Sequence, residues 1–153
     1  MNFLHGDVKS ENVLVGHHDT EVVYLIDFGL AEPYLDKQGR HNEHRRLTKF
    51  NGNFMFASNN MCDGISNSRR SDIESALYLL IYLLNQCKLP WSDFNKRFDA
   101  QTEFLKMLNE RTKACYTRQL VAITPKSMRN CVKRVLGLGY EEEPPYDYIL
   151  ECL

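Results

Sequence analysis

The sequence lacks the features that mark several classes of protein. Its 153 residues include only five cysteines, and no two of them have the C-x-x-C spacing of a zinc or redox motif. Scattered cysteines, odd in number, do not form a secreted disulfide framework, which favours a reducing compartment. Lys and Arg (19) nearly balance Asp and Glu (20), so the net charge of −1 attracts neither nucleic acid nor an anionic membrane. These absences predict a cytoplasmic or nuclear protein whose partners are neither nucleic acid nor a membrane.

The chain also lacks a long apolar run and a low-complexity segment. Its most apolar stretch, residues 73–84, is too short to cross a bilayer and contains Glu74. The first residues show no basic segment followed by an apolar one, so we expect no signal peptide. With 43% hydrophobic and 25% charged residues, the composition is that of one globular domain of common size.

The first thirty residues carry the pattern of a β-hairpin. The apolar run Val13–Val15 and the β-branched run Val22–Ile26 flank a polar turn that begins at Gly16. Residues 29–67 then show no regular pattern. Such a long irregular segment in a compact domain is typical of a functional loop.

The second half of the chain has helical patterns. Residues 72–84 are apolar on nearly every side after an acidic first turn, which predicts a central helix that is buried all round. Further helices are predicted over residues 100–108, 126–136 and 146–153. The expected fold is therefore mainly α, in the α+β class, with a short β-hairpin, a long loop segment and a buried central helix.

Two short motifs flank the predicted hairpin. Residues 5–12, His-Gly-Asp-Val-Lys-Ser-Glu-Asn, fit H-x-D-x-x-x-x-N and are called the catalytic loop below. Asp27-Phe28-Gly29 follows the second strand directly. Each motif alone is a weak signal. The order of loop, hairpin and D-F-G together is the context of a phosphoryl-transfer site.

The residue types in these motifs suit phosphoryl transfer. Nucleotide phosphates require Mg²⁺, and the amide oxygen of Asn12 and the carboxylate of Asp27 are hard ligands of the kind it prefers. Asp7 can accept the proton of an attacking hydroxyl, and Lys9 can contact the migrating phosphoryl group. We therefore expect ATP and Mg²⁺ as cofactors, with Asp7 and Lys9 as catalytic residues.

Further segments make the sequence resemble the C-terminal lobe of a eukaryotic protein kinase, most closely the casein kinase I family and its relatives, the vaccinia-related kinases. Residues 23–31 are similar to that family's magnesium-loop segment, and residues 52–58 to the end of its activation segment. Residues 68–75, Ser-Arg-Arg-Ser-Asp-Ile-Glu-Ser, are similar to the entry of its central helix. Leu89-Pro90-Trp91 and residues 144–148 match later landmarks. The resemblance implies that residues 1–153 form a partial kinase domain, the C-lobe only.

The resemblance also implies roles for single residues. It implies a Ser/Thr protein kinase that acts on a protein substrate, with Asp7 as base and Leu14 as the floor under the adenine. The cofactor-binding residues implied are Lys9, Asn12, Leu14, Ile26 and Asp27, with Asn12 and Asp27 as metal ligands. Asp72 is implied to anchor the catalytic loop. His5 and Phe28 are implied to stack in the core that aligns the magnesium loop.

At three positions the sequence departs from the family's pattern. Gly6 replaces an arginine that pairs with an activation-loop phosphate in many kinases, so activation by loop phosphorylation is not expected. Asn53 replaces a threonine whose hydroxyl links the catalytic Asp and Lys, so substrate positioning is expected to differ. Met55 stands where the family often has a phosphate-binding arginine, so no preference for prephosphorylated substrates is expected.

The largest departure is the absence of an N-lobe from the sequence. No glycine-rich loop, strand lysine or partner glutamate precedes the catalytic loop, and we expect the central helix to lose the cover that a preceding helix provides. An isolated chain of this kind is expected to be poorly stable, to aggregate or to need a partner. Three functions stay open: a truncated kinase, a kinase-lobe binding module or pseudokinase remnant, and a split kinase completed by a separate N-lobe chain.

Other candidate sites are weaker. The pairs His17-His18 and His41-x-x-His44 could hold a metal ion, but surface histidines are the favoured interpretation because no cysteine lies at zinc spacing near them. Arg40, Arg45, Arg46 and Lys49 form a locally basic loop. For this loop a solvated face is favoured over a substrate contact.

Overall fold

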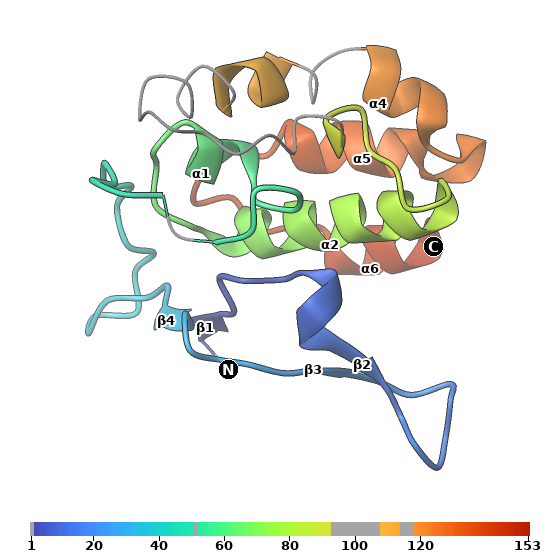
Figure 1. Ribbon diagram of the computed structural model, residues 1–153. Helices are drawn as coiled ribbons and strands as arrows, with labels where there is room; N and C mark the ends of the chain where they lie inside the picture. Colours follow the sequence, from blue (N-terminus) through green and yellow to red (C-terminus); the bar gives the residue numbers. More distant parts are fainter. Residues whose placement is uncertain (1, 51, 93–107, 114–117) are drawn as a thin grey trace.

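The computed structural model describes residues 2–50, 52–92, 108–113 and 118–153. Figure 1 shows a layer of helices above an extended N-terminal part that ends in a projecting hairpin. The strands and helices in chain order are β1 (Phe3–Leu4), η1 (Ser10–Asn12), β2 (Val13–Val15), β3 (Val23–Leu25), β4 (Glu32–Pro33), α1 (Asn59–Cys62), α2 (Arg69–Leu84), α4 (Arg118–Ile123), η3 (Lys126–Met128), α5 (Arg129–Leu136) and α6 (Tyr146–Glu151).

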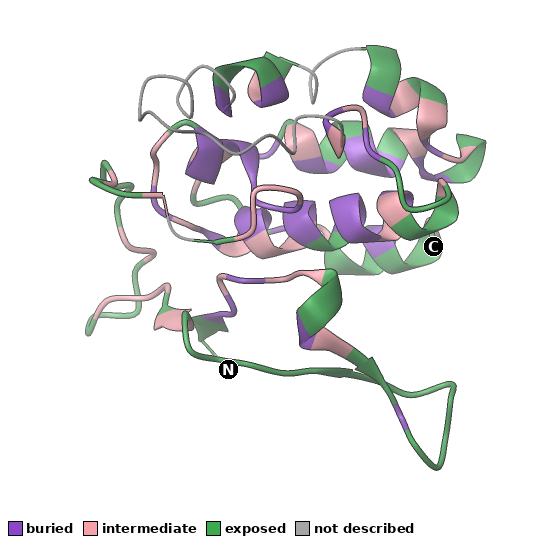
Figure 2. Ribbon diagram, in the orientation of Figure 1, coloured by how far each residue is buried: buried purple, intermediate pink, exposed green. Residues whose placement is uncertain are grey.

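The predicted hairpin is confirmed. Strands β2 and β3 pair antiparallel, with Leu14 opposite Tyr24 in the register. The Gly16 N–H donates to the Val22 carbonyl at 2.8 Å and closes the hairpin end. Most residues of this hairpin are exposed, whereas the buried residues concentrate in the helical layer (Figure 2). The core therefore lies among the helices and the hairpin extends away from it.

The central helix α2 begins three residues before the predicted start, at Arg69, because a capping box precedes it. The Ser71 side chain accepts a hydrogen bond from the Ser68 N–H at 3.1 Å. Apolar residues on one side of the helix, among them Leu77, Tyr78 and Ile81, are buried in the main core with residues of α5.

The prediction that α2 is buried all round was wrong. Ala76, Leu83 and Leu84 are exposed, and Leu80 is only half-buried. Figure 2 shows the resulting change from buried to exposed colour along α2, toward its C-terminal end. In the described part of the chain no element covers this end of the helix, so its apolar composition did not lead to complete burial.

The helix predicted over residues 126–136 starts as the short 3₁₀ helix η3 and continues as α5. The last predicted helix ends at Glu151 instead of residue 153. The helix predicted over residues 100–108 falls outside the described residues except for Leu108, which is buried. No helix in the described ranges is long and apolar enough to cross a membrane.

The long loop segment is less irregular than predicted. Residues 32–33 form β4, which pairs antiparallel with β1 and so joins this segment to the start of the catalytic loop. Residues 59–62 form the single-turn helix α1, whose N-cap Ser58 accepts a hydrogen bond from the Met61 N–H at 3.2 Å. The pairing of β4 with β1 joins residues distant in sequence, which a local pattern does not reveal.

Candidate active site

The catalytic loop is fixed by the central helix, as the resemblance implied. One carboxylate oxygen of Asp72 accepts the His5 N–H at 2.7 Å, and the other accepts the Gly6 N–H at 3.0 Å. Desolvation raises the pKa of Asp72, and the two backbone N–H groups oppose that rise. The start of the catalytic loop is thus bonded to α2 through the side chain of Asp72.

His5 joins the catalytic loop to the end of the hairpin. Its Nδ1 accepts the Asp7 N–H at 3.2 Å, so Nε2 carries the proton and donates to the Ile26 carbonyl at 2.9 Å. The ring also contacts Phe28, with ring centroids 4.9 Å apart. The expected His5–Phe28 contact therefore exists, but Phe28 is 63% exposed and does not lie in the core as expected.

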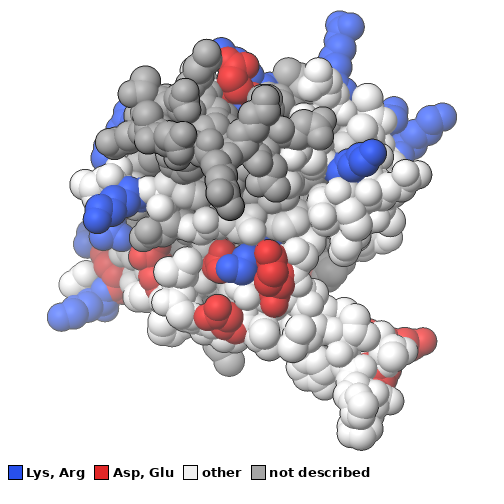
Figure 3. Space-filling view, viewed as in Figure 1, with Lys and Arg blue, Asp and Glu red and all other residues white. Residues whose placement is uncertain are grey.

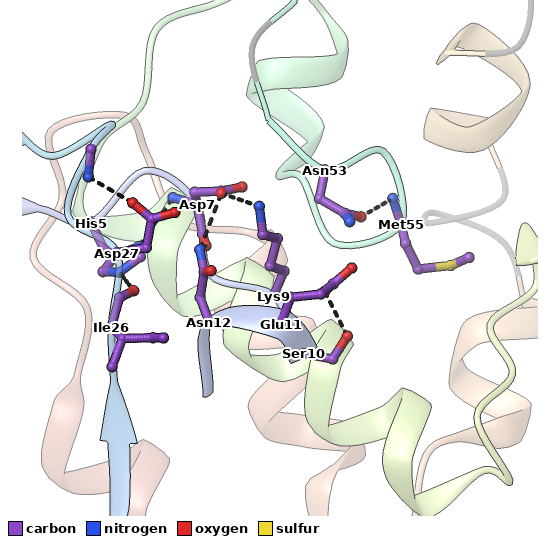
Figure 4. A network of polar contacts seen from close by, with 11 residues as sticks. His5, Asp7, Lys9, Ser10, Glu11, Asn12, Ile26, Asp27, Asn53 and Met55 are labelled. Atoms are coloured by element: carbon purple, nitrogen blue, oxygen red, sulfur yellow. Dashed lines mark hydrogen bonds and ion pairs between the residues drawn. The ribbon is translucent and has the colours of Figure 1, made fainter. Parts of the chain in front are cut away.

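Asp7, Lys9 and Asn12 form one network (Figure 4). Lys9 Nζ donates to Asp7 Oδ2 at 2.5 Å, and the Asn12 amide NH₂ donates to the same oxygen at 3.1 Å and to the Asp7 carbonyl at 2.9 Å. The hydrogen bond to Asp7 raises the pKa of Lys9, so this side chain stays protonated. Because the nitrogen of the Asn12 amide is used inside the network, its oxygen is the atom left for a cation.

Asp27 follows β3 in a strained conformation. Its φ is 62°, which is uncommon outside glycine, and its Oδ1 accepts the Gly29 N–H at 3.2 Å. The Ile26 N–H donates to the Asn12 carbonyl at 2.9 Å, which joins the backbone just before Asp27 to the residue that ends η1. In Figure 4 Asp27 lies beside Asp7 and Asn12. The strained turn directs an exposed carboxylate toward the catalytic loop.

This donor set fits Mg²⁺ bound together with nucleotide phosphates. Mg²⁺ typically takes one or two protein carboxylates and completes its shell with phosphate oxygens and water. Asp27 and the Asn12 amide oxygen supply such ligands. Among the residues that the structure describes, no three or more His, Cys, Asp or Glu side chains are grouped so that they alone could hold a metal ion. Acidic groups gather around a basic one where the hairpin meets the helices (Figure 3). Asp7, Glu11 and Asp27 are the acidic residues whose charges act on Lys9.

The two residues predicted to contact the adenine lie on one face of the hairpin. Leu14 pairs with Tyr24, and side chains of alternate residues share a face, so Tyr24 and Ile26 lie on the side of Leu14. Leu14 is 48% exposed and Ile26 is 37% exposed. The structure therefore presents both as accessible apolar surface close to the network, and their contact with a nucleotide stays a prediction.

Gly6 has a conformation that suits glycine. Its φ is +78°, and a Cβ placed there would lie 2.8 Å from the Leu30 carbonyl oxygen.

We expect Gly6→Ala to lower the free energy of unfolding by about 1–3 kcal/mol, because an L-residue is strained at this φ and the Leu30 backbone must move. Urea unfolding of both proteins measures the difference. Gly39→Ala is the control, since Gly39 has a φ of +77° but no atom within 4 Å of its added Cβ. Equal losses at both glycines would show that the Leu30 contact contributes nothing.

Asn53 and Met55 organise the loop formed by residues 52–58. The Asn53 Oδ1 accepts the Met55 N–H at 2.8 Å, and its carbonyl accepts the Ala57 N–H at 2.8 Å. The Trp91 indole N–H donates to the Met55 carbonyl at 2.8 Å. Asn53 therefore bonds within its own turn, and no hydrogen bond joins its side chain directly to Asp7 or Lys9.

Two buried charged residues that the sequence analysis did not single out support residues 57–62, at the end of this loop and in α1. Glu74 is 1% exposed, and its carboxylate accepts the Asn59 N–H at 2.8 Å and the Tyr78 hydroxyl at 2.6 Å. Arg111 is fully buried, donates to the Ala57 carbonyl and the Cys62 sulfur, and lies 4.9 Å over the Trp91 ring. Glu74 occurs in the quoted helix-entry motif, which is the signal that could have identified it. Arg111 lies in no recognisable motif.

Of the candidate histidines, His17, His18 and His44 are exposed, as the surface interpretation predicts, whereas His41 is half-buried. The rings of His41 and His44 both contact Tyr140, with centroids 5.3 Å and 5.7 Å away, and the Tyr140 hydroxyl donates to the Asn67 carbonyl. The rings of His17 and His18 contact each other in the hairpin turn. In the basic loop, Arg40 pairs with Asp36 and Arg45 with Glu32 at the surface.

Comparison with known proteins agrees with this geometry. Residues 1–140 match the family model described as the protein kinase domain. The chain belongs to the protein kinase family. Its kinase relatives include a probable casein kinase I homologue of Encephalitozoon cuniculi, 40% identical over 67% of this chain and 33% of the relative. A casein kinase 1-like protein of Oryza sativa subsp. japonica is 32% identical over 97% of this chain and 21% of the relative.

A third kinase relative is casein kinase I homolog 3 of Schizosaccharomyces pombe, which is 30% identical over 97% of this chain and 34% of the relative. These matches confirm the resemblance to casein kinase I that the motifs indicated. The chain spans between 21% and 34% of the length of these kinase relatives. The fold, a kinase-like α+β arrangement, also agrees with the family.

Proposed function

We propose that the protein takes part in transfer of a phosphoryl group from Mg-ATP to serine or threonine hydroxyls of a protein substrate. The observation that carries the proposal is the convergence of Asp7, Lys9 and Asn12 in one network with Asp27 at its side. The casein kinase I-like sequence supports the Ser/Thr class of acceptor.

In this proposal each residue has a distinct task. Asn12 and Asp27 would hold Mg²⁺, which neutralises the charge on the nucleotide phosphates when it is bound. Asp7 orients the acceptor hydroxyl and takes its proton. Lys9 remains charged because of its bond to Asp7 and stabilises charge that develops on the transferred group. Leu14 and Ile26 offer apolar surface to the adenine.

The proposal includes a partner for the apolar surface of the hairpin and α2. Val15 and Val23 on β2 and β3, and Leu83 and Leu84 at the end of α2, are each more than half exposed. An N-terminal kinase lobe, in the same polypeptide or in another chain, is a partner that could cover this apolar surface.

We expect the purified 153-residue chain to self-associate or aggregate when heated, because this surface is exposed. Light scattering during a thermal scan measures this, and a reversible monomeric transition would contradict it.

Calorimetric titration with Mg-ATP tests the proposed nucleotide site. We expect saturable binding by the wild-type protein and at least tenfold weaker binding by Asp27→Ala, because a metal ligand is lost. Asp19→Ala is the matched control, since Asp19 is also exposed and accepts a backbone N–H, from Glu21 at 2.9 Å, at the far end of the hairpin.

The outcomes separate the open functions. Two results together support a kinase. Asp27→Ala but not Asp19→Ala loses Mg-ATP binding, and the wild-type protein transfers phosphate to casein whereas Asp7→Asn does not. Binding without transfer by the wild-type protein supports a lobe that needs a second chain for activity. No binding by folded, soluble protein contradicts the proposal and favours a binding module derived from a kinase.

A further inference from the structure

The carboxylate of Asp7 is satisfied on one side only. Asp7 is 8% exposed, and its Oδ2 receives both Lys9 and Asn12. Its Oδ1 is shielded from solvent and has no hydrogen-bond partner among the described residues. A buried acceptor of this kind is costly to leave unpaired, and such atoms in native proteins are commonly paired with an ordered water molecule.

A small cavity adjoins Asp7. Its volume is about 10 Å³, close to what one water molecule needs. The lining is mostly polar, so the cavity can supply the two to four partners that a buried water requires. The polar residues among those that line it are Asp7, Asn53, Ser58, Asn67, Asp72 and Ser75.

Asn53 also lines this cavity and belongs to a different loop from Asp7. Because its Oδ1 accepts the Met55 N–H at 2.8 Å, the orientation of the amide is fixed and its NH₂ group is the part left for a ligand. Asp72 also lines the cavity, and a carboxylate can accept more bonds than the two it receives from the His5 and Gly6 N–H groups.

We propose that this cavity binds one water molecule that bridges Asp7 Oδ1 and the Asn53 amide. The water donates one hydrogen to Asp7 Oδ1 and the other to the Asp72 carboxylate, and accepts a hydrogen from the Asn53 NH₂ group. All three components, the catalytic loop, the 52–58 loop and α2, then meet at one site. Asn53 thereby acts as a positioning residue for Asp7 without touching it.

The role in catalysis rests on the proposed kinase function, whereas the water site itself does not. A bridged Asp7 carboxylate is held from both oxygens, so Oδ2 keeps a constant direction toward Lys9 and the acceptor hydroxyl. Loss of the bridge frees rotation of the carboxylate. That loss is expected to lower the rate of transfer more than substrate affinity, because it changes the geometry of the reacting groups.

A crystal structure of the full chain at a resolution that shows buried water tests the site without reference to activity. We expect one ordered water within 3.2 Å of Asp7 Oδ1 and of the Asn53 amide nitrogen. A cavity without density, while other buried waters are visible, would overturn the proposal. So would a direct bond from Asp7 Oδ1 to a protein group.

The variant Asn53→Asp tests the role of the donor. It keeps the oxygen that accepts the Met55 N–H and replaces the NH₂ group by an acceptor, so the bridge is lost while the turn remains. Asn42→Asp is the matched control, because the Asn42 amide also donates one hydrogen bond, to the Pro33 carbonyl at 2.9 Å, and does not line the cavity.

For a casein-derived peptide, we expect kcat to fall roughly 10- to 100-fold in Asn53→Asp, while KM changes less than about twofold. In Asn42→Asp we expect both kcat and KM to change little. Equal effects in the two variants would overturn the positioning role. If the wild-type protein transfers no phosphate, the proposed function fails, and the crystal structure still decides whether the water site exists.

Discussion

Replacement of Glu74 by alanine is expected to lower the free energy of unfolding by about 3–5 kcal/mol, which is a large part of the stability of a domain this size. Glu74 is almost fully buried, and the Asn59 N–H and the Tyr78 hydroxyl both donate to it. Arg70, which is 8% exposed, donates to the same carboxylate at 3.3 Å. Removal of the carboxylate leaves a buried cation without its counter-charge and removes the acceptor of the buried Asn59 N–H.

Urea unfolding followed by circular dichroism measures the loss. Glu110→Ala is the matched control, because Glu110 forms a surface ion pair with Lys113 at 3.1 Å and is expected to contribute less than about 1 kcal/mol. Glu74→Gln keeps the shape and one acceptor oxygen, so we expect it to lie between the two. A Glu74→Ala protein as stable as Glu110→Ala would show that the network does not stabilise the fold.

Asp72→Ala is expected to disrupt the catalytic loop. The His5 and Gly6 N–H groups both lose their acceptor, which should lower the free energy of unfolding by about 2–4 kcal/mol. The same loss releases the segment that carries Asp7 and Lys9. We therefore expect weaker Mg-ATP binding even at temperatures where the variant remains folded, measured by the titration described above. Unchanged binding by the folded variant would contradict this role for Asp72.

The charge on Asp72 also predicts a pH dependence. Burial raises the pKa of Asp72 above its usual value, so in the folded state it holds its proton to a higher pH than in the unfolded state. Between those two pKa values the folded state binds more protons, and stability falls as pH rises through this window. Relative to Asp72→Asn, which does not titrate there, the wild-type protein should lose stability as pH rises from about 4. Urea unfolding at several pH values measures the difference, and a constant difference would contradict it.

Features that depend on neighbouring residues could be predicted from the sequence. The hairpin appeared in its strand and turn residues, and the catalytic loop and Asp27 appeared in short motifs, because a phosphoryl-transfer site needs those groups at short spacings. The capping residues of α2 are also local, although the helix start was placed three residues late. The family resemblance then supplied Asp72, which no local pattern identifies as an anchor.

Features that depend on distant partners could not be predicted. Arg111 is buried because Ala57, Cys62 and Trp91 surround it, and these residues are far from it in sequence. The exposed end of α2 has the same composition as its buried part, so hydropathy alone cannot tell which face lacks a neighbour. The cavity beside Asp7 shows the same limit, because its lining comes from the catalytic loop, the 52–58 loop and α2, which are far apart in sequence.

The anchoring of the catalytic loop by Asp72 has a consequence for its dynamics. The amides of His5 and Gly6 lie outside the helices, yet their hydrogens are bonded to a side chain of α2. They can exchange with solvent deuterium only when that bond opens, and the bond shares the stability of the helix that supplies the carboxylate. These two amides should therefore exchange at rates close to those of α2 and far more slowly than the exposed turn of the hairpin, so that the loop and the helix open as one cooperative unit.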